Sequence, residues 1–394
     1  MQLLDRKRAL AIAPFWRLGF RPFFVAGALF ALLAVALWAA ALHGLTNPAV
    51  PGGMLAWHRH EMPFGFGLAI IAGFLLTAVQ TWTGSPGLSG RPLIALFGLW
   101  LAARLAWFFP VPLAMLIALQ LAFIGLFIAQ MARQLITARQ RNNYPILLVL
   151  SLLALCQSLT LAGLALGDDS LQRRGALAAL WLIAVMLSLI GGRVIPFFTQ
   201  RGLGRVEAFA AHPWLDRLLL VCGVLVAALF ASGHNLLASP WLAAPFIVLS
   251  ALHGLRLWRW HSRGIWRVPL LWSLHLAYAW LLLATLGMAA WHLGWLAQPS
   301  LASHALAVGG MVAPPFTYGY KSHQKSGGGN HLPGTTSLDA NTFSLVVRDI
   351  IRSLGTDGVR RLVVVNGHFE NCWPAVEGVD LGLRELRRDG IRDM

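Results

Sequence analysis

Residues 57–84 read WHRHEMPFGFGLAIIAGFLLTAVQTWTG, and this stretch decides the fold. The run 63–79 contains no charged residue, and its length is close to the roughly 20 apolar residues that a helix needs to cross a bilayer. His58, His60 and Glu61 stand beside that run. Because ionisable groups are costly to bury in a membrane, their grouping indicates a functional site. The alternative is that the histidines only cap a helix in the membrane interface.

The composition indicates a membrane protein. Of 394 residues, 57% are hydrophobic and 12% are charged, and the mean hydropathy is +0.66. Soluble domains carry about 25% charged residues. The net charge of +16 would suggest nucleic acid in a soluble protein, but here the arginines lie between apolar spans. They are better explained as topology signals and lipid-headgroup contacts, so we expect a lipid bilayer and no nucleic acid as partner.

Ten apolar spans follow one another along the chain, and they predict an all-α polytopic membrane bundle with about nine or ten spans. The tenth is too short to cross a bilayer by itself. The predicted spans are 22–42, 62–82, 92–109, 111–132, 146–166, 176–195, 214–232, 240–255, 269–294 and 301–312.

Lys and Arg alternate between the connections. The N-terminal tail and every second connection are rich in them, whereas the other connections hold only Arg59, Arg173 and Arg174. The positive-inside rule therefore predicts a cytoplasmic N-terminus in the inner membrane. It also puts His58, His60 and His304 near the outer face, and His275 roughly 9 Å inside the cytoplasmic end of its span.

Histidine is the residue type best suited to a cofactor in these spans, because neutral imidazole binds haem iron and copper. For His275 the alternative is a hydrogen-bonded core residue. His253 lies near the inner end of its span, and the simplest interpretation of it is an interfacial residue. Arg104 is a charge within a span and is expected to need a partner or a propionate-like anion. Carboxylates are nearly absent from the spans, which argues against a proton pump; a transporter or channel remains an alternative.

Several motifs resemble the NnrS family. They are WHRHEMPFGFG and AGFLLTAVQTWTG in the opening stretch, IGGRVIPFFTQRGL (190–203), RVPLLWSLHLAYAWL (267–281) and SHALAVGGM (303–311). The resemblance covers about residues 14–311. It implies a bacterial polytopic membrane protein with haem and copper, linked to the response to nitric oxide. By the same resemblance, His58, His60, His275 and His304 are the leading ligand candidates, and their division between haem and copper stays open. The family pattern has about twelve spans, and this chain stops matching in the tenth.

From residue 312 onward the composition changes, and acidic residues become frequent. Apolar residues at helical spacing predict helices at 338–354 and about 374–388, and LVVVN (362–366) reads as a buried strand. Strand-flanking helices of this kind predict a partial α/β unit. His368 and Glu370 follow the strand with a spacing that lets both reach one metal ion. The alternative is a polar loop.

The same segment resembles the creatininase (creatinine amidohydrolase) family. YGYKSHQKSGGGNHLPGTTSLD (318–339) and NGHFEN (366–371) carry the resemblance. It implies a soluble two-metal hydrolase of a cyclic amide, with His368 and Glu370 on two metal ligands and Ser326 in the substrate pocket. Phe369 stands where creatininase has Tyr, and the family's other ligands have no counterpart.

We therefore expect a chimeric chain with a junction near residue 311: an NnrS-like membrane part, 1–311, followed by a partial creatininase-like segment, 312–394. A bimetal hydrolase needs a complete ligand set, so we expect that segment to be inactive. The alternative is a membrane-tethered amidohydrolase that uses zinc or manganese.

Overall fold

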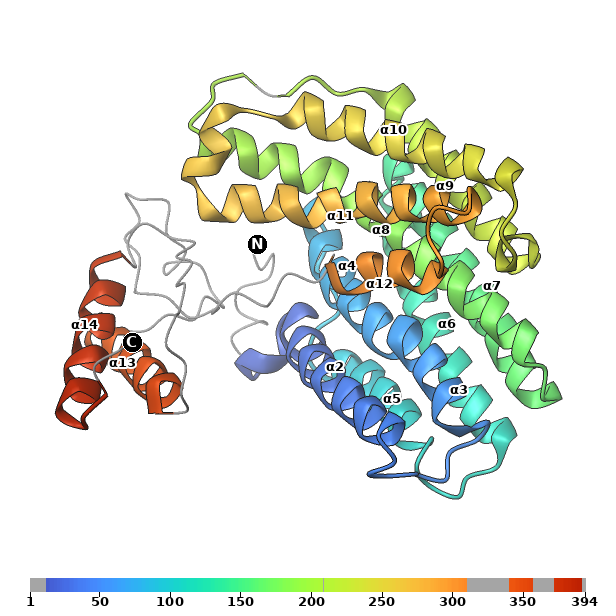
Figure 1. Cartoon of the computed structure of the whole chain (residues 1–394), viewed down its shortest axis with the longest axis horizontal. Coiled ribbons are helices and arrows are strands. Elements are labelled where there is room, and N and C mark those ends of the chain that lie inside the picture. The colour runs from blue at the N-terminus through green and yellow to red at the C-terminus, as the bar shows by residue number, and fades with distance from the viewer. Residues whose placement is uncertain (1–11, 208, 310–339, 357–371, 392–394) are drawn as a thin grey trace.

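The computed structural model describes residues 12–207, 209–309, 340–356 and 372–391, and these form helices joined by short connections (Figure 1). The long elements are α2 (Phe20–Leu42), α3 (Gly53–His60), the π-helical segment η2 (Glu61–Gly67), α4 (Leu68–Thr83), α5 (Arg91–Leu105), α6 (Leu113–Thr137), α7 (Tyr144–Leu166), α8 (Asp169–Gly202), α9 (Pro213–Ala231), α10 (Ala243–Trp260), α11 (Pro269–His292) and α12 (Pro299–Gly309). Short helices η1 (Pro14–Trp16), η3 (Arg141–Asn143), η4 (His234–Leu236), η5 (Pro240–Leu242) and η6 (Arg263–Arg267) lie in the connections.

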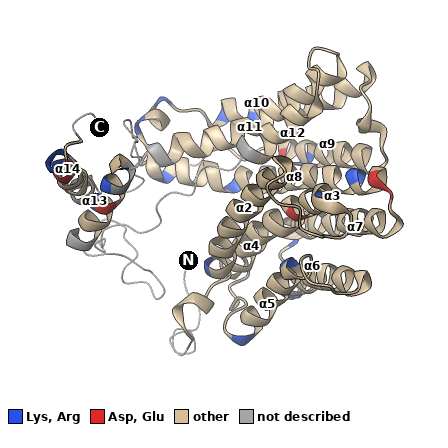
Figure 2. Cartoon of the chain, turned by 60° about the horizontal axis from the view of Figure 1, so that its bottom comes forward, with Lys and Arg blue, Asp and Glu red and all other residues tan. Residues whose placement is uncertain are grey.

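The predicted helical membrane bundle is confirmed. Within the described residues, eight helices are long and apolar enough to cross a membrane. The two other predicted spans correspond to α5, which has 15 residues, and α12, which has 11. Lys, Arg, Asp and Glu lie mainly towards the helix ends, whereas most of each helix body is uncharged (Figure 2). This distribution is expected where hydrocarbon surrounds the helix bodies.

Several helices that are neighbours in sequence pack side by side, among them α7 with α8, α8 with α9 and α10 with α11. The starts of α2 and α11 lie on the same side of the bundle, on the left in Figure 1, and we call this side the N-face. Proline occupies the first or second position of α5, α7, α9 and α11. It fits there because the missing N–H would have no intrahelical partner. Helix α12 turns back along α11 from the opposite face (Figure 1).

The stretch quoted first lies at the centre of the bundle. In the continuous span Gly53–Thr83, 72% of the most apolar window is buried, against 17% for α2. Helix α2 instead exposes Leu29, Leu32, Leu33 and Val35, as a lipid-facing helix does. Gly73 allows α2 and α4 to approach closely, because a β-carbon there would lie 2.7 Å from Cδ1 of Phe24. Small residues serve helix contacts in membranes in this way.

The C-terminal segment contributes two described helices, α13 (Ala340–Thr356) and α14 (Cys372–Arg388), close to the predicted ranges. They pack against each other, and a β-carbon on Gly378 would lie 2.7 Å from Cβ of Val347. Arg348 and Arg352 form ion pairs with Glu385 at 3.7 and 3.6 Å. The predicted strand 362–366 and the residues Ser326, His368 and Glu370 lie outside the described residues.

Candidate functional site

A π-helical turn separates α3 from α4. Its seven residues, EMPFGFG, include Pro63, whose nitrogen carries no hydrogen to donate to an earlier carbonyl. The backbone N–H of Leu68 instead donates to the carbonyl of Pro63, five residues earlier. Wide turns of this kind inside α-helices are frequent at functional sites. Here the turn sets how His58, His60 and Glu61 are presented to the neighbouring helices.

Glu61 is fully buried; it accepts two hydrogen bonds and forms an ion pair with Arg104. Nδ1 of His60 and Nε1 of Trp107 lie 2.8 and 2.7 Å from its Oε1, and Nε of Arg104 lies 2.6 Å from its Oε2. Arg104 also donates to the carbonyl of Phe64 and to Oε1 of Gln120. The predicted partner of Arg104 is therefore a carboxylate of the protein, and the arginine needs no propionate-like anion.

His60 uses both ring nitrogens inside the protein. The Glu61 carboxylate can only accept, so Nδ1 carries the hydrogen. Nε2 is then an acceptor, and it faces the amide nitrogen of Gln157 at 3.3 Å. A carboxylate behind Nδ1 is also the usual support of a metal-binding imidazole. In this structure, however, Gln157 occupies the position that a metal ion would take.

His58 and His304 lie close to each other. They come from α3 and α12, and they are near enough for a charge on one imidazole to act on the other. Each lies five residues after the start of its helix, so both sit at a similar depth below the face opposite the N-face. The sequence analysis placed both residues near the same face, and the structure adds that their helices bring them near each other.

Both imidazoles of this pair keep a ring nitrogen without a partner. Nδ1 of His58 is buried and makes no hydrogen bond, and the ring stacks on Trp38 at 4.7 Å. Nδ1 of His304 donates to the carbonyl of Ser300 at 2.7 Å. Because Nδ1 carries the hydrogen, Nε2 of His304 keeps a free lone pair. A neutral imidazole binds a metal through such a nitrogen.

His275 lies apart from that pair. It is the seventh residue of α11, which begins at the N-face, so it lies about 18 Å along the bundle from the depth of His304 at the helical rise of 1.5 Å. Its Nδ1 donates to the carbonyl of Leu271 at 2.8 Å. Its buried Nε2 faces the end of α10 without a well-formed hydrogen bond. Of the four predicted ligands, the structure thus brings together His58 and His304 and keeps His275 separate.

Among the described residues, no group of three or more His, Cys, Asp or Glu side chains is placed to hold one metal ion.

A second buried network was missed at the sequence level. The spans predicted from the sequence left Arg256 in a connection. In the structure it is only 3% exposed, and it forms an ion pair with Asp216. It also donates to the hydroxyl of Tyr278 at 3.1 Å, and that hydroxyl lies 2.9 Å from Nδ1 of His253. His253 is therefore a core residue, and its interpretation as interfacial was wrong. The available signal was Asp216, the one carboxylate of its span, in the first turn of α9.

Comparison with known proteins identifies the membrane part. The family model described as NnrS protein matches residues 14–313. The chain belongs to the NnrS family. All the residues of the Glu61 network and of the His58–His304 pair lie within the NnrS match.

The model of the creatinine amidohydrolase family matches residues 290–393. Creatinine amidohydrolase of Pseudomonas putida is 62% identical over 86 residues, which are 22% of this chain and 33% of that protein. The chain thus spans about a third of that relative's length. No solved structure matches the chain. Both resemblances predicted from the sequence are confirmed.

Proposed function

We propose that this NnrS-family chain is a haem- and copper-binding protein of the bacterial inner membrane, linked to the response to nitric oxide. Its N-face is cytoplasmic, and His58 and His304 are its haem ligands. The observation that carries the proposal is the meeting of these two imidazoles, each with an unengaged ring nitrogen, at one depth of the bundle.

The residues of the pair fit haem iron better than they fit a structural role alone. A buried imidazole nitrogen without a hydrogen bond is costly, and it is the donor atom that ligates iron. Haem, when bound, supplies an iron centre whose ligand chemistry includes diatomic gases. Ser300 fixes the tautomer of His304 through its carbonyl, and Trp38 holds the plane of the His58 ring.

The Glu61 network positions this site. Glu61 and Arg104 connect η2 to α5, and Gln120 extends the connection to α6. Because these side chains are buried and joined by an ion pair and hydrogen bonds, the end of α3 that carries His58 is held against two other helices. We assign His60 to this supporting network rather than to the haem, since Gln157 faces its Nε2.

For copper, His275 is the candidate ligand that remains. Its Nδ1 is oriented by the carbonyl of Leu271, and its Nε2 is buried. Its position near the N-face favours a copper site separate from the haem.

The creatininase-like segment carries the alternative function, a metal-dependent amidohydrolase tethered to the membrane. The match of 62% identity favours the origin of the segment in such an enzyme. We propose that the segment 312–394 by itself does not hydrolyse cyclic amides, because a bimetal centre needs more ligands than His368 and Glu370.

The test of the haem proposal is the absorption spectrum and haem content of the purified full chain. His58→Ala and His304→Ala should each lose most of the haem or shift its Soret band. His43→Ala is the matched control, because His43 lies at the end of α2 and is exposed. Unchanged spectra in both variants would show that the pair does not bind haem.

A further inference from the structure

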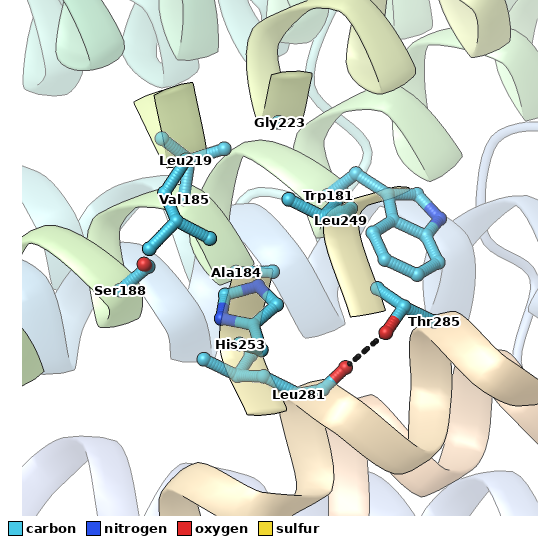
Figure 3. A pocket seen from close by; sticks show the side chains of 10 residues that line it. All are labelled: Trp181, Ala184, Val185, Ser188, Leu219, Gly223, Leu249, His253, Leu281 and Thr285. Carbon is cyan, nitrogen blue, oxygen red and sulfur yellow. Dashed lines mark hydrogen bonds between the residues drawn. The ribbon is translucent and has the colours of Figure 1, made fainter. Parts of the chain in front are cut away.

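A small cavity lies between α8, α9, α10 and α11, away from the His58–His304 pair (Figure 3). Its free volume is about 10 Å³, close to the minimum that one water molecule needs. Most of its wall is apolar, including Val185, Leu219 and Leu249, and the imidazole of His253 stands in the middle of the lining residues (Figure 3). None of the lining residues is charged.

The network behind His253 decides which of its nitrogens carries the hydrogen. Arg256 can only donate, so the Tyr278 oxygen accepts from it at 3.1 Å. The hydroxyl hydrogen of Tyr278 is then available to Nδ1 of His253 at 2.9 Å, closer than Oγ of Ser188 at 3.3 Å. With Nδ1 as acceptor, the neutral ring carries its hydrogen on Nε2, on the side away from Tyr278.

That N–H has no partner within the described protein. His253 is only 4% exposed, and no hydrogen bond in the described residues uses its Nε2. Buried polar groups nearly always find a partner, from the protein or from a bound molecule. The hydroxyl oxygens of Ser188 and Thr285 also line the cavity, so a molecule there has up to three polar neighbours. This number is typical of an internal water site.

We propose that the cavity is a binding site for one small, uncharged hydrogen-bond acceptor, held by Nε2–H of His253, with water as its simplest occupant. The ligand is uncharged, because the walls are apolar and Asp216 already neutralises Arg256. Tyr278 is a positioning residue, since it fixes the tautomer that carries the hydrogen on Nε2 of His253, a residue of the cavity wall. Arg256 and Asp216 link this site to the N-face, where the Asp216 side chain is 57% exposed.

The test uses the full chain in lipid nanodiscs, labelled with 5-fluorotryptophan and observed by ¹⁹F NMR. Trp181 forms part of the cavity wall and is 2% exposed; its resonance is assigned with Trp181→Phe. Trp107, at 0% exposure, and Trp241, at 88%, are the internal dry and wet controls. Exchange of H₂O for D₂O should shift the Trp181 resonance as it shifts that of Trp241, and leave Trp107 unchanged.

Variants then test the role of His253. His253→Phe should abolish the isotope shift at Trp181, whereas His253→Gln, which keeps an N–H donor, should retain it. Tyr278→Phe should reduce it. Unchanged Trp107 and Trp241 resonances report that each variant is folded.

Two results would overturn the proposal. The first is a wild-type protein in which D₂O shifts the Trp181 resonance no more than that of Trp107. Such a result would mean that the cavity is dry. This measurement needs no substitution at His253. The second is an isotope shift that survives in a folded His253→Phe variant, which means that His253 does not hold the occupant.

Discussion

Arg104 and Glu61 form a fully buried ion pair, with Nε of the arginine 2.6 Å from Oε2 of the glutamate. The pair joins α5 to the π-helical turn at the centre of the bundle. A buried charge that loses its partner is far more costly than an exposed one, so this contact is the most sensitive point of the membrane part.

Replacing one member of this pair should therefore destabilise the protein strongly. Arg104→Ala is expected to cost about 3–5 kcal/mol, because it leaves the Glu61 carboxylate buried and unpaired. Arg104→Ala combined with Glu61→Gln should cost less than the sum of the two single changes. Unfolding of the purified protein in mixed micelles measures these differences. Additive costs would show that the two charges do not stabilise each other.

The contact between α7 and α8 depends on a glycine. A β-carbon on Gly175 would lie 2.6 Å from the carbonyl oxygen of Cys156, so Gly175→Ala forces two backbones apart. We expect a loss of about 1–3 kcal/mol, as for other overpacked cores. Gly125→Ala in α6 is the matched control, since a β-carbon there meets nothing within 4 Å. Equal thermal stability of the two variants would contradict the close approach.

The topology can be tested by cysteine labelling in intact cells, in a background without the three native cysteines. Asn47 and Arg263 are both exposed, on connections at opposite faces. A membrane-impermeant thiol reagent should label Asn47→Cys and should label Arg263→Cys only after the cells are opened. The reverse pattern would place the N-terminus outside the cytoplasm.

The creatininase-like segment should show no catalysis in the full chain. Hydrolysis of creatinine, assayed with added zinc or manganese, is expected to remain at the level of the His368→Ala variant. Turnover that His368→Ala abolishes would make the amidohydrolase the leading function.

The helices could be predicted from the sequence because each depends on local features. Apolar runs and prolines such as Pro145 and Pro213 fix where helices lie, and no knowledge of the neighbours is needed. The need of Arg104 for a partner was equally predictable, since any charge inside a span is costly to bury.

The partners themselves could not be predicted. Glu61 meets Arg104, and His58 meets His304, only because helices that are distant in sequence pack together. Arg256 was assigned to a connection because it lies at the edge of an apolar run, yet its long side chain reaches into the bundle to Tyr278 and Asp216. Gln157, which faces Nε2 of His60, belongs to a residue type that carries no functional signal by itself.

The wide turn at Glu61–Gly67 also determines how the residues before it are oriented relative to α4. A turn that spans five residues per hydrogen bond holds one residue more than an ordinary helical turn would. If the segment closed as a regular α-helix with all seven residues kept, everything before it would rotate by about 100° relative to α4. Trp57 and His58 would then exchange the inside of the bundle for its surface. The wide turn thus absorbs the extra residue, and a one-residue deletion within EMPFGFG should convert the turn to α-helix while the residues before it keep their positions.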